Sequence, residues 1–537
     1  MITTIISTVG ISDALSLLII ISIFYVARFY YHYFTRPNPL PGPFPLPIIG
    51  SAYQQIGYGF NDWLLSLNKK YGDMYEIILA GQRLIVLGKA DLIENMNIPS
   101  STKTNYPNRW PNTEGFVEYG FDGVGVGFNN VHKSWNYNRQ FFSQALMTPS
   151  FNYQAIEWTN ELWNEMESYW NNLGEDYEID LIKWMRRFAN EMIFRISTGV
   201  KNDALASYYN KITLENNNIN PLNEFVESLE TYIEGILYFF AFSKFIRHYL
   251  PFIRGKVKKL LKNKDYLFNK LYTIVKERRN EIEKTPLDQP LRHDMLTSYI
   301  TANTPRDINI MKHADADLLR PMTDKEIFGN ILDAMIGGTD TTSNLFCFIV
   351  YHLEHYPEVK LRLRQEFDRI LGNDLTRPIT FKDLDELVYC DAVIKEVYRH
   401  TPIVFFLGRV NAQNDNVGGY NWPEGTQFQI LISVLMKHKD YWTEPEKFDP
   451  DRFYKVEESD KYFLEKKKMK NTFQMFGGGI RICPGRKLAM IELKCLLILV
   501  YRKYDIELVD KNSPLKYKRD FFNLCKELAV KVKPRKF

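Results

Sequence analysis

The chain is poor in cysteine and has no marked excess of either charge. Its 537 residues include five cysteines, none of them among the first 346 residues. An odd number spread so unevenly is not typical of a disulfide framework, and it indicates a reducing compartment. Because 68 Lys and Arg stand against 64 Asp and Glu, the composition gives no basic footprint for nucleic acid, and we expect no nucleic-acid partner.

The chain also lacks the features that usually separate domains. Past residue 50 we find no long Gly/Ser-rich or Pro-rich linker and no internal repeat. Length alone would allow several domains. The lack of linkers instead favours one large domain over residues 51–537.

Long apolar runs are missing except near the amino terminus. The segment "ALSLLIIISIFYVARFYYHYF", with the residues before it, approaches the ~20 apolar residues that cross a bilayer. A cleaved signal peptide fits less well, because no Lys or Arg precedes the apolar core and no small-residue cleavage site follows it. We therefore expect a retained single-pass membrane anchor over residues 1–35.

Charged residues beside the apolar run predict its orientation. Arg28 and Arg36 follow the apolar core, whereas only Asp13 precedes it, so the positive-inside rule leaves the large domain in the cytosol. The next segment, "RPNPLPGPFPLPIIG" over residues 36–50, predicts a stiff extended spacer. Proline fixes φ and biases the preceding residue away from helix.

Helical periodicity dominates the rest of the chain. The stretch "MYEIILAGQRLIVLG" indicates a hairpin around residues 80–83, and residues 405–433 mix short apolar runs with turn signals. The predicted class is mostly α with a minor β region. Long helical patterns lie near residues 133–147, 151–172, 178–198, 222–240, 255–285, 324–355, 357–371, 383–400 and 485–503.

The helical pattern that starts at Asp324 contains a defect. Thr323 and Glu326 have the spacing of a capping box. In the middle of the same pattern, "IGGTDTTSN" places Gly337 beside Gly338 and then continues with poor helix formers. Each glycine costs about 1 kcal/mol relative to alanine in a helix interior. Such a defect indicates a requirement of packing or function.

Cys483 has unusual neighbours. In "FQMFGGGIRICPGRKLAMIELK" it follows three glycines and Arg481, at the start of a helical pattern, where helix N–H groups and the arginine would stabilise a thiolate. Structural zinc fits poorly, because no second ligand lies nearby at zinc spacing. A cysteine nucleophile would need a partner that nine scattered histidines do not single out. An axial thiolate for haem iron needs only one cysteine.

The segment "FGGGIRICPG" resembles the haem-binding loop of the cytochrome P-450 family. Phe476, Gly479, Arg481, Cys483 and Gly485 stand on the family's fixed positions, and chance would give such a match with a probability on the order of 10⁻⁴. Weaker family motifs occur elsewhere in the proper order. They are Trp135 and Arg139 in "WNYNR", Gly338–Thr341, Glu396 and Arg399 in "EVYR", and Arg452 in "PDRF".

The resemblance implies a cytochrome P-450 fold in a single large domain behind a transmembrane helix, with haem b as cofactor. Cys483 would be the axial ligand of the haem iron. Trp135, Arg139 and Arg481 would hold the haem propionates, with Arg409 as a further candidate. The other positions that the family assigns to haem binding are Gly338, Phe476, Gly479 and Gly485.

The resemblance also assigns roles away from the haem loop. Glu396, Arg399 and Arg452 would form a buried ion-pair network that fixes the chain around the loop. Asp340 and Thr341 would be the catalytic pair, relaying protons through water to dioxygen. Gly337 and Gly338 would let the helix backbone lie close to the haem.

The implied function is a monooxygenase anchored in the endoplasmic reticulum membrane, in contact with membrane lipid. It would insert one oxygen atom of O₂ into a small apolar substrate, with electrons from NADPH–cytochrome P-450 reductase and a cytochrome b-type protein as second candidate donor. Two alternatives stay open, a haem-thiolate isomerase or dehydratase that acts on peroxides and a haem protein without turnover. The pair Asp340 and Thr341 argues against both. The sequence does not identify the substrate.

A dense basic cluster lies shortly before the haem loop. It consists of Lys466, Lys467, Lys468 and Lys470 in "LEKKKMKN". A solvated charge run explains it as well as a docking surface for an acidic reductase does. We keep both interpretations.

Overall fold

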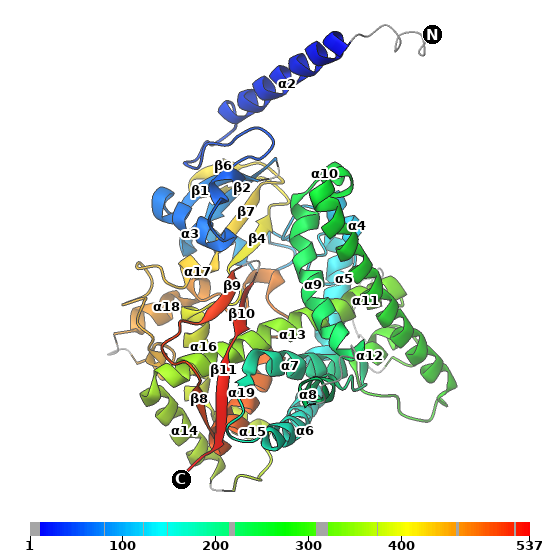
Figure 1. The fold of residues 1–537 in the computed structure, drawn as a ribbon, viewed down its shortest axis with the longest axis vertical. Coiled ribbons are helices and arrows are strands. Elements are labelled where there is room, and N and C mark those ends of the chain that lie inside the picture. Colours follow the sequence, from blue (N-terminus) through cyan, green and yellow to red (C-terminus); the bar gives the residue numbers. More distant parts are fainter. Residues whose placement is uncertain are drawn as a thin grey trace.

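The computed structural model of the protein describes residues 11–79, 81–121, 123–147, 149–213, 221–307, 320–372, 374–457, 461–519 and 522–536. Figure 1 shows a helical body with a small sheet at one end, and one helix projecting from that end. Buried apolar side chains from Leu40 to Val532 form a single core cluster. The class is therefore mostly α, as the sequence predicts.

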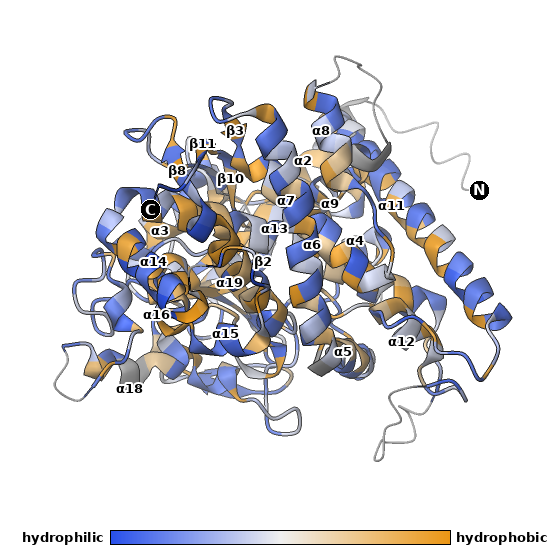
Figure 2. Cartoon of the chain, turned by 90° about the horizontal axis from the view of Figure 1, so that it is seen from below, coloured by the Kyte–Doolittle hydropathy of each residue, from blue (hydrophilic) through white to orange (hydrophobic). Residues whose placement is uncertain are grey.

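Helices make up most of the described chain. The longer ones are α2 (Ile11–Phe34), α3 (Phe60–Tyr71), α5 (His132–Met147), α6 (Pro149–Leu173), α7 (Leu181–Thr198), α8 (Ala204–Thr213), α9 (Pro221–Ala241), α11 (Pro251–Lys284), α13 (Asp324–His355), α14 (Pro357–Leu371), α16 (Val388–His400), α18 (Phe463–Thr472) and α19 (Arg486–Lys503). The shorter ones are α4 (Glu114–Tyr119), α10 (Lys244–Tyr249), α12 (Met295–Thr301), α15 (Phe381–Glu386) and α17 (Ile432–Leu435). Figure 2 shows α11 along one edge of the molecule, with mostly hydrophilic residues.

The sheets are small. The largest has the order β1-β2-β7-β4, in which the predicted hairpin β1–β2 is antiparallel and β2 runs parallel to β7. Its strands are β1 (Met74–Leu79), β2 (Gln82–Leu87), β4 (Phe406–Val410) and β7 (Gln427–Leu431). The remaining strands are β3 (Ile179–Asp180), β8 (Tyr504–Leu508) and β11 (Ala529–Pro534) in one sheet, β9 (Lys516–Arg519) with β10 (Asn523–Glu527), and β5 (Asp415–Val417) with β6 (Tyr420–Trp422).

The helix expected over residues 383–400 is divided. Helix α15 ends at Glu386 and α16 begins at Val388. The carboxylate of Glu366 accepts hydrogen bonds from the backbone N–H groups of Tyr389 and Cys390, at 2.7 and 2.8 Å. These bonds satisfy donors in the first turn of a new helix. Periodicity gives no sign of them, because Glu366 belongs to α14.

Helix α13 crosses the centre of the body and begins as predicted. The hydroxyl of Thr323 accepts from the backbone of Glu326, whose carboxylate accepts in return from the Thr323 backbone. Helix α7 packs along it. From Asp324 to His355 α13 is one continuous α-helix, so Gly337 and Gly338 do not interrupt it.

Helix α2 projects away from the body (Figure 1). Among the described residues, its segment Leu15–Phe34 is the one helical stretch long and apolar enough to cross a membrane, and none of it is buried. The spacer after it contacts the sheet, because Arg36 and Arg83 both pair with the buried carboxylate of Glu76. The position of α2 therefore fits the anchor expected from the sequence.

Candidate active site

Cys483 lies in a tight loop in front of α19. Its backbone N–H donates to the carbonyl of Phe476 at 2.8 Å, which closes the loop. Gly477 and Gly479 have φ of +71° and +66°, values that favour glycine. A Cβ on Gly479 would also lie 2.9 Å from the carbonyl oxygen of Met96. The glycines of the motif are therefore needed for the loop's shape.

The surroundings of the Cys483 thiol act on its ionisation in opposite directions. Burial raises the pKa of Cys483, while the N–H of Gly485 donates to the sulfur and the cations Arg139, Arg109 and Arg486 lower the pKa. The expected helix-start stabilisation is thus present at Gly485. Coordination to a metal cation would complete the stabilisation of the thiolate.

A cavity of about 290 Å³ opens beside Cys483. Cys483 and Phe476 line one side, and Gly337, Gly338 and Thr341 of α13 line another. Most of the remaining lining is apolar, including Phe128, Phe142, Leu146, Ile193, Leu345, Ile403, Val404, Phe406 and Leu407. The cavity thus places the haem-loop residues and the α13 motif around one space.

Arg481 is held rigidly at the cavity wall. Its guanidinium donates to the backbone carbonyls of Pro107, Asn129 and Val126, at 2.6, 2.8 and 3.4 Å. It also lies 4.1 Å from the ring centroid of Trp135, whose indole N–H donates to the same Val126 carbonyl at 3.1 Å. Trp135 and Arg481, far apart in sequence, therefore act as one unit.

Three further arginines line the same cavity: Arg109, Arg139 and Arg409. They donate to backbone carbonyls, and within the described chain Nε of Arg109 and Nε of Arg409 have no hydrogen-bond partner. Burial, together with repulsion from Arg109, lowers the pKa of Arg409 to about 9 and that of Arg139 to about 10. Arg109 was not among the residues that the sequence motifs single out.

This cationic cluster fits a dianionic cofactor. Asp333 is the carboxylate that acts on Arg109 and Arg481, so the four guanidinium groups, of which those of Arg409 and Arg481 are buried, keep an excess of positive charge. Buried charges need partners, and Arg groups with unpaired N–H donors suit carboxylates. The two propionates of haem b meet this need. The residues present therefore fit the cofactor that the sequence implies.

The two glycines of the α13 motif have different environments. A Cβ on Gly337 would meet no other atom within 4 Å, whereas a Cβ on Gly338 would lie 2.6 Å from the Ile193 side chain of α7. The hydroxyl of Thr341 donates to the Gly337 carbonyl at 2.5 Å. Gly337 thus leaves space at the helix surface, and Gly338 permits close packing of α13 on α7.

Asp340 does not point at the cavity as Thr341 does. Its carboxylate is buried and pairs with Arg186 of α7 at 2.9 Å, and Arg186 also pairs with Glu230 of α9 at 2.7 Å. Burial raises the pKa of Asp340, and the Arg186 cation opposes that rise. The structure therefore brings Thr341 to the cavity and Asp340 into an ion-pair chain beside it.

Asp333 is a site residue that the sequence analysis missed. Its carboxylate lines the cavity and accepts from the backbone N–H groups of Val126 and Gly127, at 2.6 and 2.8 Å. Burial raises the pKa of Asp333 to about 6, against these two hydrogen bonds. Asp333 thereby attaches the loop before α5 to α13. Only its position two turns before Thr341 could have marked it.

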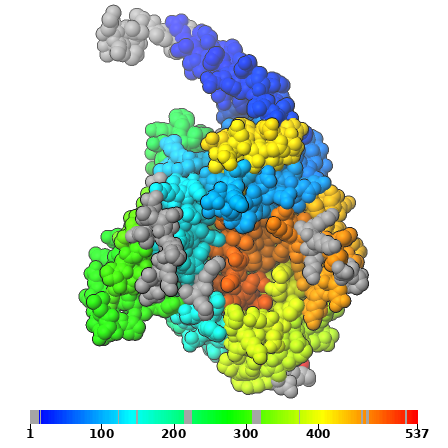
Figure 3. Space-filling model, turned by 180° about the vertical axis from the view of Figure 1, so that it is seen from behind, coloured from blue at the N-terminus to red at the C-terminus, as the bar shows by residue number. Residues whose placement is uncertain are grey.

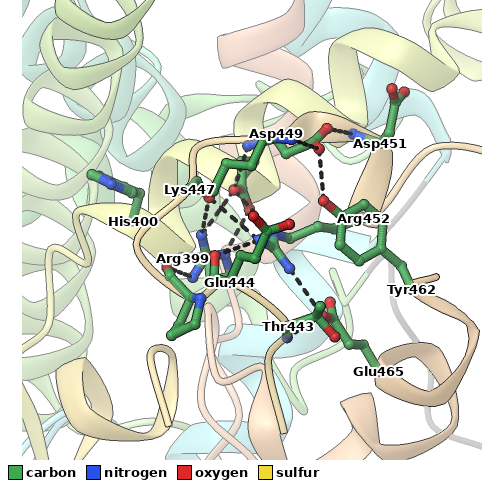
Figure 4. A network of polar contacts seen from close by, with 12 residues as sticks. Arg399, His400, Thr443, Glu444, Lys447, Asp449, Asp451, Arg452, Tyr462 and Glu465 are labelled. Atoms are coloured by element: carbon green, nitrogen blue, oxygen red, sulfur yellow. Dashed lines mark hydrogen bonds and ion pairs between the residues drawn. The ribbon is translucent and has the colours of Figure 1, made fainter. Parts of the chain in front are cut away.

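The structure brings Glu396, Arg399 and Arg452 together, and Figure 4 shows Arg399, Arg452 and Glu465 in this network. Arg399 forms a bidentate pair with Glu396 at 2.7 and 2.8 Å, and Arg452 approaches the same carboxylate at 3.4 Å. All three side chains are fully buried. Glu465 of α18 joins them through a 2.9 Å contact with Arg452. Two carboxylates thus balance two guanidinium groups, and burial raises the pKa of Glu396 against the pull of both arginines.

Comparisons with known proteins agree with this geometry. The chain is 25% identical to cytochrome P-450 3A18 of Rattus norvegicus over 512 residues, covering 93% of this chain and 92% of that protein. It is likewise 25% identical to cytochrome P-450 4d10 of Drosophila mettleri, over 92% of this chain and 91% of that one. The crystal structure of the cytochrome P-450DA haem domain shares the fold, with a TM-score of 0.73 at 18% identity over 93% of this chain and 98% of that chain.

The family assignment follows from these findings together. The model of the cytochrome P-450 family matches residues 40–533, which include the Cys483 loop, the arginine cluster and the α13 motif. Members of this family bind haem b through a cysteine thiolate. The chain belongs to the cytochrome P-450 family of haem-thiolate monooxygenases.

Proposed function

We propose that this monooxygenase inserts one oxygen atom of O₂ into a small apolar substrate, with electrons from NADPH through cytochrome P-450 reductase. The observation that carries the proposal is the apolar cavity beside Cys483, with the arginine cluster on its wall. Apolar cavities with few polar groups suit apolar ligands. The haem, when bound, supplies the iron that activates O₂. Cys483 would bind its iron through the thiolate, and Arg109, Arg139, Arg409 and Arg481 would hold its propionates.

Thr341 and Asp340 would supply the protons. Thr341 lines the cavity, and its hydroxyl, which here donates to the Gly337 carbonyl, would instead donate to the reacting oxygen during turnover. Asp340 is linked through Arg186 to Glu230. The side chain of Arg186 is 17% exposed and that of Glu230 is 47% exposed. The chain Glu230–Arg186–Asp340 therefore runs from solvent to α13. The carboxylate of Asp340 would leave Arg186, take a proton from water and pass it inward toward Thr341.

Electron donors would dock on the face shown in Figure 3, where the segment around residues 475–495 lies in a hollow between neighbouring segments. A groove of about 350 Å³ lies there, lined by Phe476, Arg486, Lys487 and Lys494. Basic rims raise the encounter rate of acidic partners. Of the predicted lysine cluster, Lys470 is exposed, while the side chains of residues 466–468 lie outside the described part. We include the cluster in the docking surface.

The membrane would lie at the sheet end of the molecule. Residues 1–35 would be the anchor in the endoplasmic reticulum membrane, residues 36–50 the spacer, and residues 51–537 the cytosolic catalytic domain. Support comes from α10 and the start of α11, which lie at the same end as α2 (Figure 1). Three of their aromatic side chains are strongly exposed, Phe245 by 70%, Tyr249 by 70% and Phe252 by 95%. Such side chains enter a bilayer interface readily.

One experiment separates this function from its alternatives. The reconstituted protein with reductase, NADPH and ¹⁸O₂ should place one ¹⁸O atom in the product of an apolar substrate, chosen from lipids, sterols, terpenes and aromatics by spectral binding screens. Rearrangement of an organic peroxide without NADPH would instead support an isomerase or dehydratase. If ligands shift the haem spectrum but none of them is converted to a product, the result would favour a haem protein without turnover.

A further inference from the structure

The segment over residues 244–262 carries an unbalanced charge. It contains seven Lys and Arg residues and no Asp or Glu. Neighbouring acids pair with three of the seven, in the contacts Lys244–Glu114, Arg247–Glu118 and Lys256–Glu234, at 3.5, 2.6 and 2.8 Å. The other four have no ion pair within the described chain, and all four are exposed: Arg254, Lys258, Lys259 and Lys262.

These four cations are placed where the helix itself gains nothing from them. Arg254 lies in the first turn of α11, which begins at Pro251, and the positive end of the helix dipole disfavours a cation there. Arg254, Lys258 and Lys262 also follow one another at intervals of four, so their like charges repel along one helix face. The arrangement is unfavourable within the molecule and becomes favourable beside an anionic surface.

The apolar neighbours of the cations identify that surface. Phe252 is in the same first turn, and Phe245 stacks on Tyr249 in α10 at a centroid distance of 5.4 Å. Exposed aromatic residues next to Lys and Arg are typical of helices that lie in a membrane interface. Clusters of four or more Lys and Arg beside a membrane attract anionic lipids. In Figure 1, α10 and the start of α11 lie at the end from which α2 projects.

We infer that Arg254, Lys258, Lys259 and Lys262 bind the headgroups of anionic phospholipids. The inference rests on the membrane orientation proposed above. It adds that the start of α11 selects lipids with negatively charged headgroups from the leaflet that it contacts. The aromatic side chains would enter the apolar layer, and the four cations would contact phosphate and carboxylate groups above it. The surface attracts anionic lipid by about 1 kcal/mol per cation, a factor of about five each at low salt.

Acylation of lysines tests the inference on the full-length holoprotein. The protein is placed in nanodiscs of phosphatidylcholine alone or with one fifth phosphatidylserine, and a water-soluble acylating reagent is read out by peptide mass spectrometry. Lys258, Lys259 and Lys262 should react several-fold more slowly in the anionic discs, and high salt should remove the difference. Lys276 and Lys284, exposed residues of the same helix farther from α10, are internal controls. Equal rates in both discs would overturn the inference.

Charge-reversal variants give an independent readout. When polymer extracts the parent protein from mixed membranes into nanodiscs, those discs should be enriched in phosphatidylserine. The double variant Lys258→Glu/Lys262→Glu should lose this enrichment. The matched variant Lys276→Glu/Lys284→Glu should keep it. Equal enrichment in all three proteins would contradict the inference, as would lysine protection that appears only when an acidic soluble protein is added.

A fluorophore at position 252 separates the two proposals. A polarity-sensitive label on the Phe252→Cys variant should report an apolar surrounding in both kinds of nanodisc, if α10 and α11 reach the bilayer. An aqueous signal in both would contradict the membrane orientation itself. An apolar signal in both, with equal acylation rates, would leave the orientation standing and overturn only the headgroup selectivity.

Discussion

The two sides of the cavity are held together in different ways. Around Cys483 the loop is closed by a contact close in sequence, between Cys483 and Phe476, and the network near it by Glu396 with Arg399, although Arg481 also ties the loop to the distant Pro107. On the α13 side they join distant segments, since Asp333 lies 207 residues from Val126. Short-range contacts leave a spaced motif in the sequence, and long-range contacts leave none. If this contrast holds, removing a contact on either side should destabilise that side of the cavity or impair its role in the reaction.

The largest effect should come from the haem ligand. Cys483→Ala removes the thiolate, so the reduced carbon monoxide adduct should lose the red-shifted Soret band that thiolate ligation gives. The control is Cys495→Ala, twelve residues further along the chain within α19 and fully buried, which should keep the band. A Cys483→Ala protein that retains haem and the same band would contradict the ligand assignment.

The ion-pair network should give the next largest effect. Glu396→Gln leaves Arg399 and Arg452, both fully buried, with Glu465 as the remaining carboxylate. Removing one partner of a buried pair costs about 3–5 kcal/mol, so the free energy of unfolding of the holoprotein should fall by that amount in denaturant titrations. Glu386→Gln, at the exposed end of α15, should change it by less than about 0.5 kcal/mol. Equal losses in the two variants would mean that the network does not stabilise this side.

The same contrast explains what the sequence predicts. The mostly α class, the β1–β2 hairpin, the capping box at Thr323 and the Cys483 loop all follow from local patterns. Arg109, Arg186, Asp333 and Glu465 do not, because each acts on a segment 13 to 372 residues away. Glu465 lies next to the lysine run, a sequence context typical of a solvated charge, yet it is buried against Arg452.

Gly125 tests the long-range side directly. Its φ is +75°, and a Cβ there would lie 2.2 Å from Oδ2 of Asp333. Gly125→Ala therefore combines backbone strain with a clash, and we expect a loss of about 2–4 kcal/mol together with weaker substrate binding. Gly123→Ala is the matched control, because φ is +64° but the nearest atoms lie 4.0 Å away. It should cost about 1 kcal/mol. Similar losses would show that Asp333 does not fix this loop.

Thr341 should affect efficiency more than stability. Thr341→Ala removes the hydroxyl at the cavity, so protons arrive out of order and electrons are diverted to peroxide or water. Product formed per NADPH should fall several-fold, while haem binding stays intact. Ser343→Ala, two residues along and bonded to backbone carbonyls within the helix, should leave the ratio close to that of the parent. An unchanged ratio in Thr341→Ala would exclude the relay.

The smallest effect should come from the outer surface of the Cys483 side. Reversing Lys466, Lys467, Lys468 and Lys470 to Glu should slow first-electron transfer from the reductase by a few-fold at low salt, because rim charges act mainly on association. The difference should vanish as salt shortens the Debye length to ~3 Å at 1 M. The matched variant reverses four exposed lysines elsewhere, Lys69, Lys70, Lys276 and Lys284, and should transfer electrons at the parent rate. If both variants are slowed equally, net charge explains the effect; if neither is slowed, the cluster serves solubility alone. Donor docking on this surface is supported only if the cluster variant transfers the first electron more slowly than the matched variant.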